Sequence, residues 1–355
     1  MAVEDAAPLA RSLRGIAVPR IASVIGGRLI SAILVIWGVV TLTFLLTRVF
    51  SGDPTNLFAQ PTDTAADRAA IRQRLGLADP IPVQYVHYLN DVIHGNLGTS
   101  YLTFRPVTAD LLNKLPATAE LAVYALIFGV VVGVAVGVLS AVFEGSLFDK
   151  ATRIFTAAGL ALPQFWVALM LILIFYVQLH VVPGPTGRLA IGMQPPPTVT
   201  GFYTIDSILT GHLSTFWPAV RQLILPVLTL GYVVASPLAG GTRSAMILAL
   251  RADYVRTARA LGLSRSRIWF VYAFRNAMLP VITMLAGLVA FVLSGTVLIE
   301  AVFGWPGVGQ YALNALQQSD FPAVQGFVLY ASILYVVIYQ LLDIAYSFAD
   351  PRIRS

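Results

Sequence analysis

Six long stretches of this 355-residue chain contain no Asp, Glu, Lys or Arg, and they constrain its fold more than any other feature. A helix needs about 20 apolar residues to cross a hydrocarbon core of about 30 Å, and the stretches have this length. Only 11% of the residues are charged, against roughly a quarter in soluble domains. The pattern therefore excludes a soluble enzyme and predicts an all-α polytopic membrane protein with six transmembrane helices. The stretches are 29–47, 121–143, 154–187, 222–242, 276–299 and 321–342.

The distribution of positive charge predicts the orientation of these helices. Arg11, Arg14, Arg20 and Arg28 precede the first stretch, and positive residues flanking a first helix keep that flank in the cytoplasm. A cleaved signal peptide is the alternative, but its apolar core would have only about 7 to 15 residues. With a retained first helix, six crossings give an N-in, C-in topology. The cytoplasmic segments then hold 15 Lys and Arg residues and the outer segments hold 8.

The expected segments alternate between membrane, outer face and cytoplasm. The outer segment 48–116 is much the longest, and its two short amphipathic stretches fit either a solvated connection or a cap that docks a partner. We expect spans at 29–47, 117–143, 154–180, 222–242, 277–300 and 321–343, cytoplasmic segments at 1–28, 144–153, 243–275 and 344–355, and further outer segments at 181–221 and 301–320.

Gly129, Gly133 and Gly137 follow one another at four-residue spacing in the second span. Small residues on one face let two helices approach closely in lipid. A helix-packing role is therefore favoured over a binding site.

Prolines and one carboxylate are the candidates for a transport pathway. Pro163, Pro226 and Pro237 lie in or at the start of spans, where proline frees a carbonyl that a neighbour or a water-lined cavity must satisfy. Pro280 is expected at the start of its span, where proline is tolerated. Glu300, near the outer end of the fifth span, is either a pathway or gating residue or a carboxylate that anchors a neighbouring segment.

The cytoplasmic segment 243–275 carries seven arginines and a helix-turn-helix pattern. Helix-forming residues from Arg251 to Leu261 are ended by Gly262, and Ser264 can cap a second helix that runs to Arg275. Positive residues gather in cytoplasmic loops for topological reasons alone. Two ordered helices and a sharp turn exceed that requirement, so we favour a docking element.

Several kinds of chemistry are missing from the sequence. The chain has only two lysines, Lys114 and Lys150, and neither lies in a G-x-x-x-x-G-K-[ST] phosphate loop. It also lacks the zinc motif H-E-x-x-H and the nucleophile motif G-x-S-x-G, so no catalytic residue and no metal site is predicted. No ionisable residue lies deep in a span, as an ion-driven carrier would require. The chain is therefore a passive channel or receives its energy from another subunit.

Two motifs resemble a known family. Tyr254 to Ser264 reads Tyr-Val-Arg-Thr-Ala-Arg-Ala-Leu-Gly-Leu-Ser and is followed by Arg-Asn-Ala-Met-Leu-Pro, ending at Pro280. Leu298 to Gly309 reads Leu-Ile-Glu-Ala-Val-Phe-Gly-Trp-Pro-Gly-Val-Gly. Both are similar to membrane-spanning permease subunits of ABC importers of the dipeptide, oligopeptide and nickel type, in particular the first permease of the pair. The resemblance covers roughly residues 25–355.

The resemblance implies a type I ABC importer permease fold and half of a translocation pathway in the inner membrane of a prokaryote. The expected partners are a homologous second permease, two cytoplasmic ATPase subunits or one fused chain, an extracytoplasmic binding protein and membrane lipid, but no nucleic acid. ATP and Mg would bind to the ATPase partners, and this chain would hold no cofactor. The helix that ends at Gly262 would be the coupling helix, with Arg256 where the general motif has Glu and Thr257 where it has Ala. The expected coupling residues are Tyr254, Arg256, Thr257, Ala258, Arg259, Leu261 and Gly262, with Tyr254, Ala258 and Leu261 forming an apolar contact stripe.

Other functions stay open at this stage. Di- and oligopeptides are the favoured substrates, and nickel, glutathione and other small solutes are carried by similar proteins. A stand-alone channel or secondary carrier would not copurify with ATPase subunits, and a membrane scaffold without a pathway would tolerate changes at Glu300 and at the kinked prolines.

Overall fold

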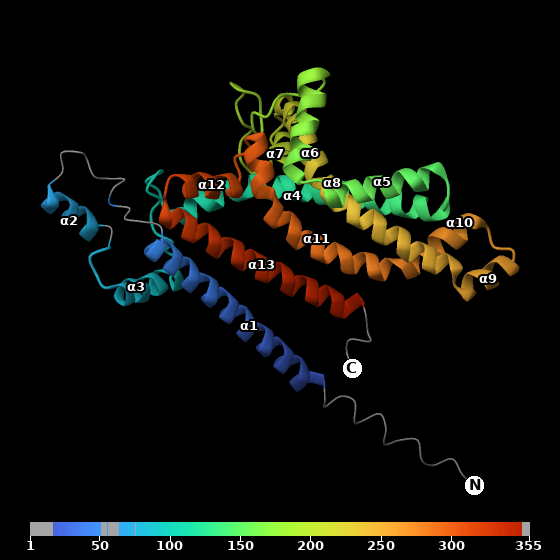
Figure 1. Cartoon of the computed structure of the whole chain (residues 1–355), viewed down its shortest axis with the longest axis horizontal. Coiled ribbons are helices and arrows are strands. Elements are labelled where there is room, and N and C mark those ends of the chain that lie inside the picture. Colours follow the sequence, from blue (N-terminus) through green and yellow to red (C-terminus); the bar gives the residue numbers. More distant parts are fainter. Residues whose placement is uncertain (1–16, 51–54, 56–63, 75, 350–355) are drawn as a thin grey trace, which may run out of the picture. The chain divides into compact units, whose positions relative to one another are not determined.

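A computed structural model describes residues 17–50, 55, 64–74 and 76–349. Parts of the predicted tails and of the predicted outer segment 48–116 lie outside these residues. All the long secondary-structure elements in the described residues are helices (Figure 1). The α-helices are α1 (Ala17–Leu45), α2 (Ala65–Arg74), α3 (Ile81–Ile93), α4 (Val107–Val142), α5 (Leu147–Ala161), α6 (Gln164–Leu171), α7 (Tyr203–Leu209), α8 (Leu213–Arg251), α9 (Asp253–Ala260), α10 (Arg265–Arg267), α11 (Phe274–Phe303), α12 (Val308–Gln317) and α13 (Phe321–Ala349), and π-helical segments cover Leu46–Phe50, Ile172–Gln178 and Ile268–Ala273.

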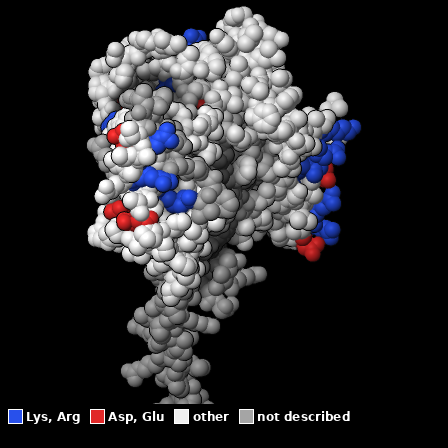
Figure 2. All heavy atoms as spheres, turned by 60° about the vertical axis from the view of Figure 1, so that its left-hand side comes forward, with Lys and Arg blue, Asp and Glu red and all other residues white. Residues whose placement is uncertain are grey.

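Five of these helices are long and apolar enough to cross a membrane, and the bent pair α5 and α6 adds a sixth if it counts as one span. Charged side chains gather in a few patches on the surface, with broad uncharged areas between them (Figure 2). Exposed apolar side chains such as Ile33, Leu34 and Trp37 on α1 suit contact with lipid. The described chain is therefore an all-α protein of the polytopic membrane class.

The chain divides into two units. The first comprises residues up to His87 together with Val328–Leu341, and the second comprises Tyr88–Phe327 together with residues from Leu342 onward. In the first unit, the hydroxyl oxygens of Thr41 on α1 and Tyr85 on α3 lie 2.6 Å apart. The Tyr85 ring also packs against Phe44, with 5.2 Å between ring centroids. These contacts fix α3 to α1.

The second unit is built on the close pair α4 and α8. Gly129, Gly133 and Gly137 of α4 face α8, where an added Cβ would meet side chains and the backbone carbonyls of Gly231, Ala235 and Ala239. Because lipid supplies no hydrophobic force between helices, this close backbone approach provides the packing contacts that hold the pair together. Helices α5, α6, α7 and α11 also pack on α8.

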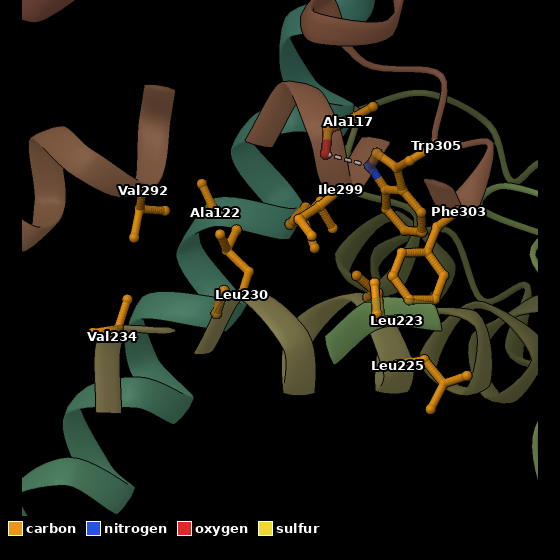
Figure 3. Close-up of a cluster of buried hydrophobic side chains, with 13 residues drawn as sticks. Ala117, Ala122, Leu223, Leu225, Leu230, Val234, Val292, Ile299, Phe303 and Trp305 are labelled. Atoms are coloured by element: carbon orange, nitrogen blue, oxygen red, sulfur yellow. Dashed lines mark hydrogen bonds between the residues drawn. The ribbon is translucent and has the colours of Figure 1, made fainter. Parts of the chain in front are cut away.

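The main core of the second unit lies between α4, α6, α8 and α11. It includes Leu121 of α4, Leu230 of α8 and Ile299 of α11, all fully buried, and Trp305 just beyond α11 (Figure 3). The indole Nε1–H of Trp305 donates a hydrogen bond of 2.8 Å to the carbonyl of Ala117, so this large side chain is both packed and hydrogen-bonded.

One expectation about proline agrees with the structure and one needs correction. The span expected at 154–180 bends next to Pro163, where a kink was suggested: α5 ends at Ala161, α6 begins at Gln164, and the two meet at an angle of 114° (Figure 1). Pro280 does not begin a helix, because α11 starts at Phe274 and a π-helical segment precedes it. Pro280 therefore lies inside α11, where it cannot donate the helical hydrogen bond to the carbonyl of Asn276.

Candidate functional site

The predicted docking element is a helical hairpin at the end of α8. The backbone of Ala252 is extended, with ψ 154°, and separates α8 from α9. The helix expected from Arg251 to Leu261 is therefore interrupted at Ala252. After Gly262 the chain turns into α10 and the π-helical segment Ile268–Ala273, which leads directly into α11. The hairpin thus connects two of the long helices of the second unit.

The turn between the two arms has the geometry of a Schellman motif. The N–H of Leu263 donates to the carbonyl of Ala258 over 3.2 Å, and the N–H of Gly262 donates to that of Arg259 over 3.0 Å. Gly262 has a φ of +73°, which L side chains rarely adopt. A Cβ at this position would meet nothing within 4 Å. Backbone conformation, and not crowding, is therefore the reason for a glycine here.

A small apolar core closes the hairpin. Val255 and Ala258 on α9 are buried against Ile268, with Leu263 and Trp269 packed around them. The predicted contact stripe was wrong in one member, because Ala258 faces the hairpin's own core and not its outer surface. Its small side chain lets the second arm approach α9. Val255, which the sequence analysis missed, is the other buried residue of this face.

The opposite face of α9 is exposed. Tyr254 and Leu261 are 39% and 74% exposed, and Leu261 is one of the most accessible apolar side chains of the second unit. Arg256 and Arg259 are exposed as well, and the Arg256 guanidinium lies 3.2 Å from the Asp253 carboxylate. An ion pair with both partners this exposed contributes little to stability. The face is therefore free to contact a partner through cationic and apolar groups.

Ser264 and Thr257 have local roles. Ser264 stands at the N-cap position of α10, but its side chain makes no capping hydrogen bond, so the expected side-chain cap is absent. The hydroxyl of Thr257 donates to the carbonyl of Asp253 one turn earlier. Neither side chain creates a binding site.

An ionic cluster around the buried Asp149 joins the α4–α5 turn to α8, the helix that precedes the hairpin. The Asp149 carboxylate accepts two hydrogen bonds from Arg243 of α8, of 2.6 and 3.0 Å. The hydroxyl of Ser140 and the N–H of Gly145 also donate to Asp149. A bidentate guanidinium–carboxylate pair sets orientation as well as distance. The cluster therefore holds the α4–α5 turn against α8 at Arg243.

Glu300 was the candidate pathway or gating residue. In the structure it anchors a neighbouring segment, the start of α12. Its side chain is 0% exposed. Thr118 of α4 donates to it over 2.6 Å, and the N–H of Gln310 in the first turn of α12 donates over 2.9 Å. The same Thr118 hydroxyl accepts from the N–H of Val308 over 2.8 Å. Glu300 and Thr118 thus act as remote N-caps of α12.

The proposed pathway residues do not come together. Pro163 is exposed at the bend between α5 and α6, whereas Pro226 is buried inside α8. Glu300 is buried at the end of α11, apart from both of these surroundings, and a role of the three residues in a pathway stays a prediction.

A second buried ion pair links α4 to the segment that precedes α7. Arg188 donates through Nη2 to Glu120 of α4 over 2.5 Å and to the carbonyl of Gly201 over 2.6 Å. Glu120 also accepts from the N–H and the hydroxyl of Thr204 at the start of α7. The pair therefore ties the segment between α6 and α7 to α4. Its partners are 68 residues apart, which spacing alone could not reveal.

The loop before α7 is ordered by a further carboxylate, Asp206. Burial acts to raise the pKa of Asp206, but hydrogen bonds from the side chain and N–H of Thr200 and from the N–H groups of Val199 and Gly201 lower it below its usual value. Its carboxylate is therefore ionised at neutral pH and holds the loop in a closed turn.

The chain matches a known family of membrane transport components along most of its length. Residues 133–355 match the family described as "Binding-protein-dependent transport system inner membrane component", and residues 22–122 match the N-terminal region of membrane components of such systems. The chain belongs to this family. Its members are membrane permease components and not enzymes.

The relatives are similar along nearly their whole length. The probable D,D-dipeptide transport system permease protein DdpB of Escherichia coli K12 is 42% identical over 93% of this chain and 97% of its own. The di/tripeptide permease DppB of Pseudomonas aeruginosa is 41% identical over 90% of this chain and 94% of its own. The dipeptide permease DppB of E. coli K12 is 38% identical over 89% and 94%.

Proposed function

We propose that this permease forms one half of the translocation pathway of an ATP-driven importer of di- and oligopeptides. Its relatives are named as permeases of dipeptide and di/tripeptide transport systems. The observation that carries the mechanistic part is the ordered hairpin between α8 and α11, which has its own core and an exposed cationic face. We place the chain in the inner membrane with both termini in the cytoplasm and with the spans and loops at the expected segments.

The hairpin is suited to transmit movement because it is fixed at both ends. Met246 and Ala249 of α8 share a buried cluster with Ala273 and Ala277 at the start of α11 and with the inner end of α4. A force on α9 therefore acts on α8 and α11 together. ATP binding on a partner can favour one of two pathway conformations only if the partner contacts the hairpin differently in each.

The proposed partners are those expected for a component of a binding-protein-dependent transport system. A homologous permease would complete the pathway, and two cytoplasmic ATPase subunits, or one fused chain, would bind the hairpins and supply ATP hydrolysis with Mg. An extracytoplasmic binding protein would deliver the peptide to the outer face. On this chain, Tyr254, Arg256, Arg259 and Leu261 are the proposed contacts with an ATPase subunit, and Gly262 keeps their helix in place.

Copurification and transport test this proposal together. A tagged chain isolated in mild detergent from its native host should retain a second permease and ATPase subunits. Proteoliposomes that contain the complex and its binding protein should take up dialanine with ATP but not with a non-hydrolysable analogue. The double variant Arg256→Glu/Arg259→Glu should lose the ATPase subunits, because it reverses the charge of the exposed face. Arg221→Glu, at an exposed position of α8 on the expected outer side, is the matched control.

Two outcomes would contradict the proposal. A chain that purifies without ATPase subunits and lets solute pass without ATP would be a channel. A chain that needs an ion gradient instead of ATP would be a secondary carrier.

A further inference from the structure

A cavity of about 380 Å³ opens in the second unit near the expected outer ends of its helices. This volume lies in the range of small-molecule sites. Its walls come from the start of α4, the segment between α6 and α7, α7 itself and the turn after α11. The side chains that matter for binding are Asp110, Asn113, Lys114, Arg188, Tyr203 and Pro306.

Arg188 is held rigidly in the wall of this cavity. Its side chain is 8% exposed, and its guanidinium carbon lies 3.4 Å from the centroid of the Tyr203 ring. Both of its hydrogen bonds use Nη2. The Nε–H is buried and has no acceptor among the described residues. A buried donor without an acceptor is costly, so an acceptor atom brought to this N–H on binding would be stabilised.

Lys114 supplies positive charge to the same cavity. Its ammonium lies 5.8 Å from the centroid of the Tyr311 ring, and no described carboxylate lies within ion-pair distance of it. Burial, with the negative charges of Asp110 and Asp320, raises the pKa of Tyr311 to about 12, so the hydroxyl of Tyr311 stays neutral and does not neutralise Lys114.

The carboxylates near the cavity already have partners. Asp110 accepts a hydrogen bond of 2.6 Å from Thr103 and lies 3.8 Å from Arg105. Glu120 is paired with Arg188. Arg105 and Arg188 are thus paired with Asp110 and Glu120, whereas Lys114 interacts electrostatically with the buried Glu300 without an ion pair between them. The ammonium of Lys114 is therefore available for a closer pair with a ligand carboxylate.

We propose that this cavity is a subsite for the carboxylate terminus of a short peptide at the outer face of the permease. Lys114 provides the charge for the carboxylate, and Arg188 provides a fixed N–H donor for an oxygen of the same end of the peptide. The cavity would accept a free peptide and reject one whose carboxylate is blocked. This inference rests on the proposed function, because it concerns the substrate of that transport.

Direct binding measures this preference without the selectivity of the binding protein. The detergent-purified complex of permeases and ATPase subunits is titrated with dialanine and with dialanine amide. Wild type should bind dialanine about tenfold or more tightly than the amide, because a charge-assisted contact is lost in the amide. Lys114→Gln should remove the preference, and Lys114→Arg should keep it. Lys150→Gln, which changes the only other lysine of the chain, should leave both affinities unchanged.

Arg188 is not suited to the first test, since its removal would leave Glu120 buried without its charge partner. The double variant Glu120→Gln/Arg188→Gln removes both charges together and serves as the second variant. With Lys114 still present, it should weaken binding of dialanine and of the amide by similar factors, so that the preference persists.

The remaining outcomes overturn the inference. Equal affinities of wild type for the two peptides, or no dialanine binding up to about 10 mM, would exclude the subsite. If Lys114→Gln left peptide binding intact but weakened the affinity of the complex for the binding protein, the cavity would receive a protein side chain instead. Uptake of dialanine by proteoliposomes distinguishes failure of the proposed function from failure of the proposed subsite. Without ATP-driven uptake the proposed function fails, whereas uptake without the binding preference contradicts only the subsite.

Discussion

Replacing Gly262 tests whether the shape of the hairpin couples it to a partner. At a φ of +73° an L residue has an unfavourable backbone conformation, which costs about 1–2 kcal/mol. No atom lies within 4 Å of an added Cβ, so crowding adds nothing. The substitution should destabilise only the Schellman turn. It should lower the population of the hairpin conformation that binds the partner about 5- to 30-fold.

Side-chain chemistry should grade this effect. Asn tolerates left-handed backbone, Ala tolerates it less, and a β-branched residue tolerates it least. ATP-driven uptake of dialanine in proteoliposomes should therefore fall in the order Gly262, Gly262→Asn, Gly262→Ala, Gly262→Val. Retention of ATPase subunits on the tagged chain should fall in the same order. Gly262→Asp adds a negative charge beside the arginines and should also reduce uptake.

The chain offers a closely matched control. Gly211, before α8, has the same φ of +73° and also has no neighbour within 4 Å. Gly211→Val therefore introduces the same backbone cost at a position away from the hairpin. Wild-type uptake and ATPase retention by Gly262→Val would refute the coupling role of the turn. Equal losses in Gly211→Val would show that backbone strain anywhere in the chain suffices.

Three further predictions concern the stability of the second unit, measured by thermal unfolding of the purified complex. Gly133→Leu should destabilise it by about 2 kcal/mol or more, because α4 and α8 must separate, while Gly287→Leu should not, since no atom lies within 4 Å of a Cβ there. Asp149→Ala should cost about 3 kcal/mol by leaving Arg243 unpaired, and unchanged stability would contradict the clamp. Asp206 has a pKa below its ordinary 3.8, so its contribution is complete above that pH and is lost as the pH falls through the lowered value. Asp206→Asn should therefore flatten the acid side of the stability profile.

The sequence predicted the helical elements well because the membrane imposes a simple rule on them. A run without charges must form a helix that satisfies its own backbone groups, whatever its neighbours are. Gly262 was also predictable, since a glycine after a helical pattern is a local signal. Pro163 indicated a kink, but the 114° bend depends on what α5 and α6 each pack against, which no local pattern contains. The prediction that Ala258 lies on the exposed contact stripe was wrong for the same reason. A small residue between the apolar and the exposed faces of α9 can be assigned to one of them only when the position of the second arm of the hairpin is known.

The charged residues near the helix ends were harder to interpret, and the structure shows why. Absence of charge from the span centres predicts that ions do not drive transport, but the function of each terminal charge depends on its partner. Glu120 meets Arg188 over 68 residues, Asp149 meets Arg243 over 94, and Glu300 meets Thr118 over 182. Which ends meet is decided by helix packing, so spacing along the chain carries no signal. The carboxylate that seemed best placed for a pathway is fully occupied as an anchor. Lys114, which drew attention only because it lies outside any ATP-binding motif, lines a cavity and forms no ion pair among the described residues. In a chain with so few charges, the informative ones are those that packing leaves without an ion-pair partner.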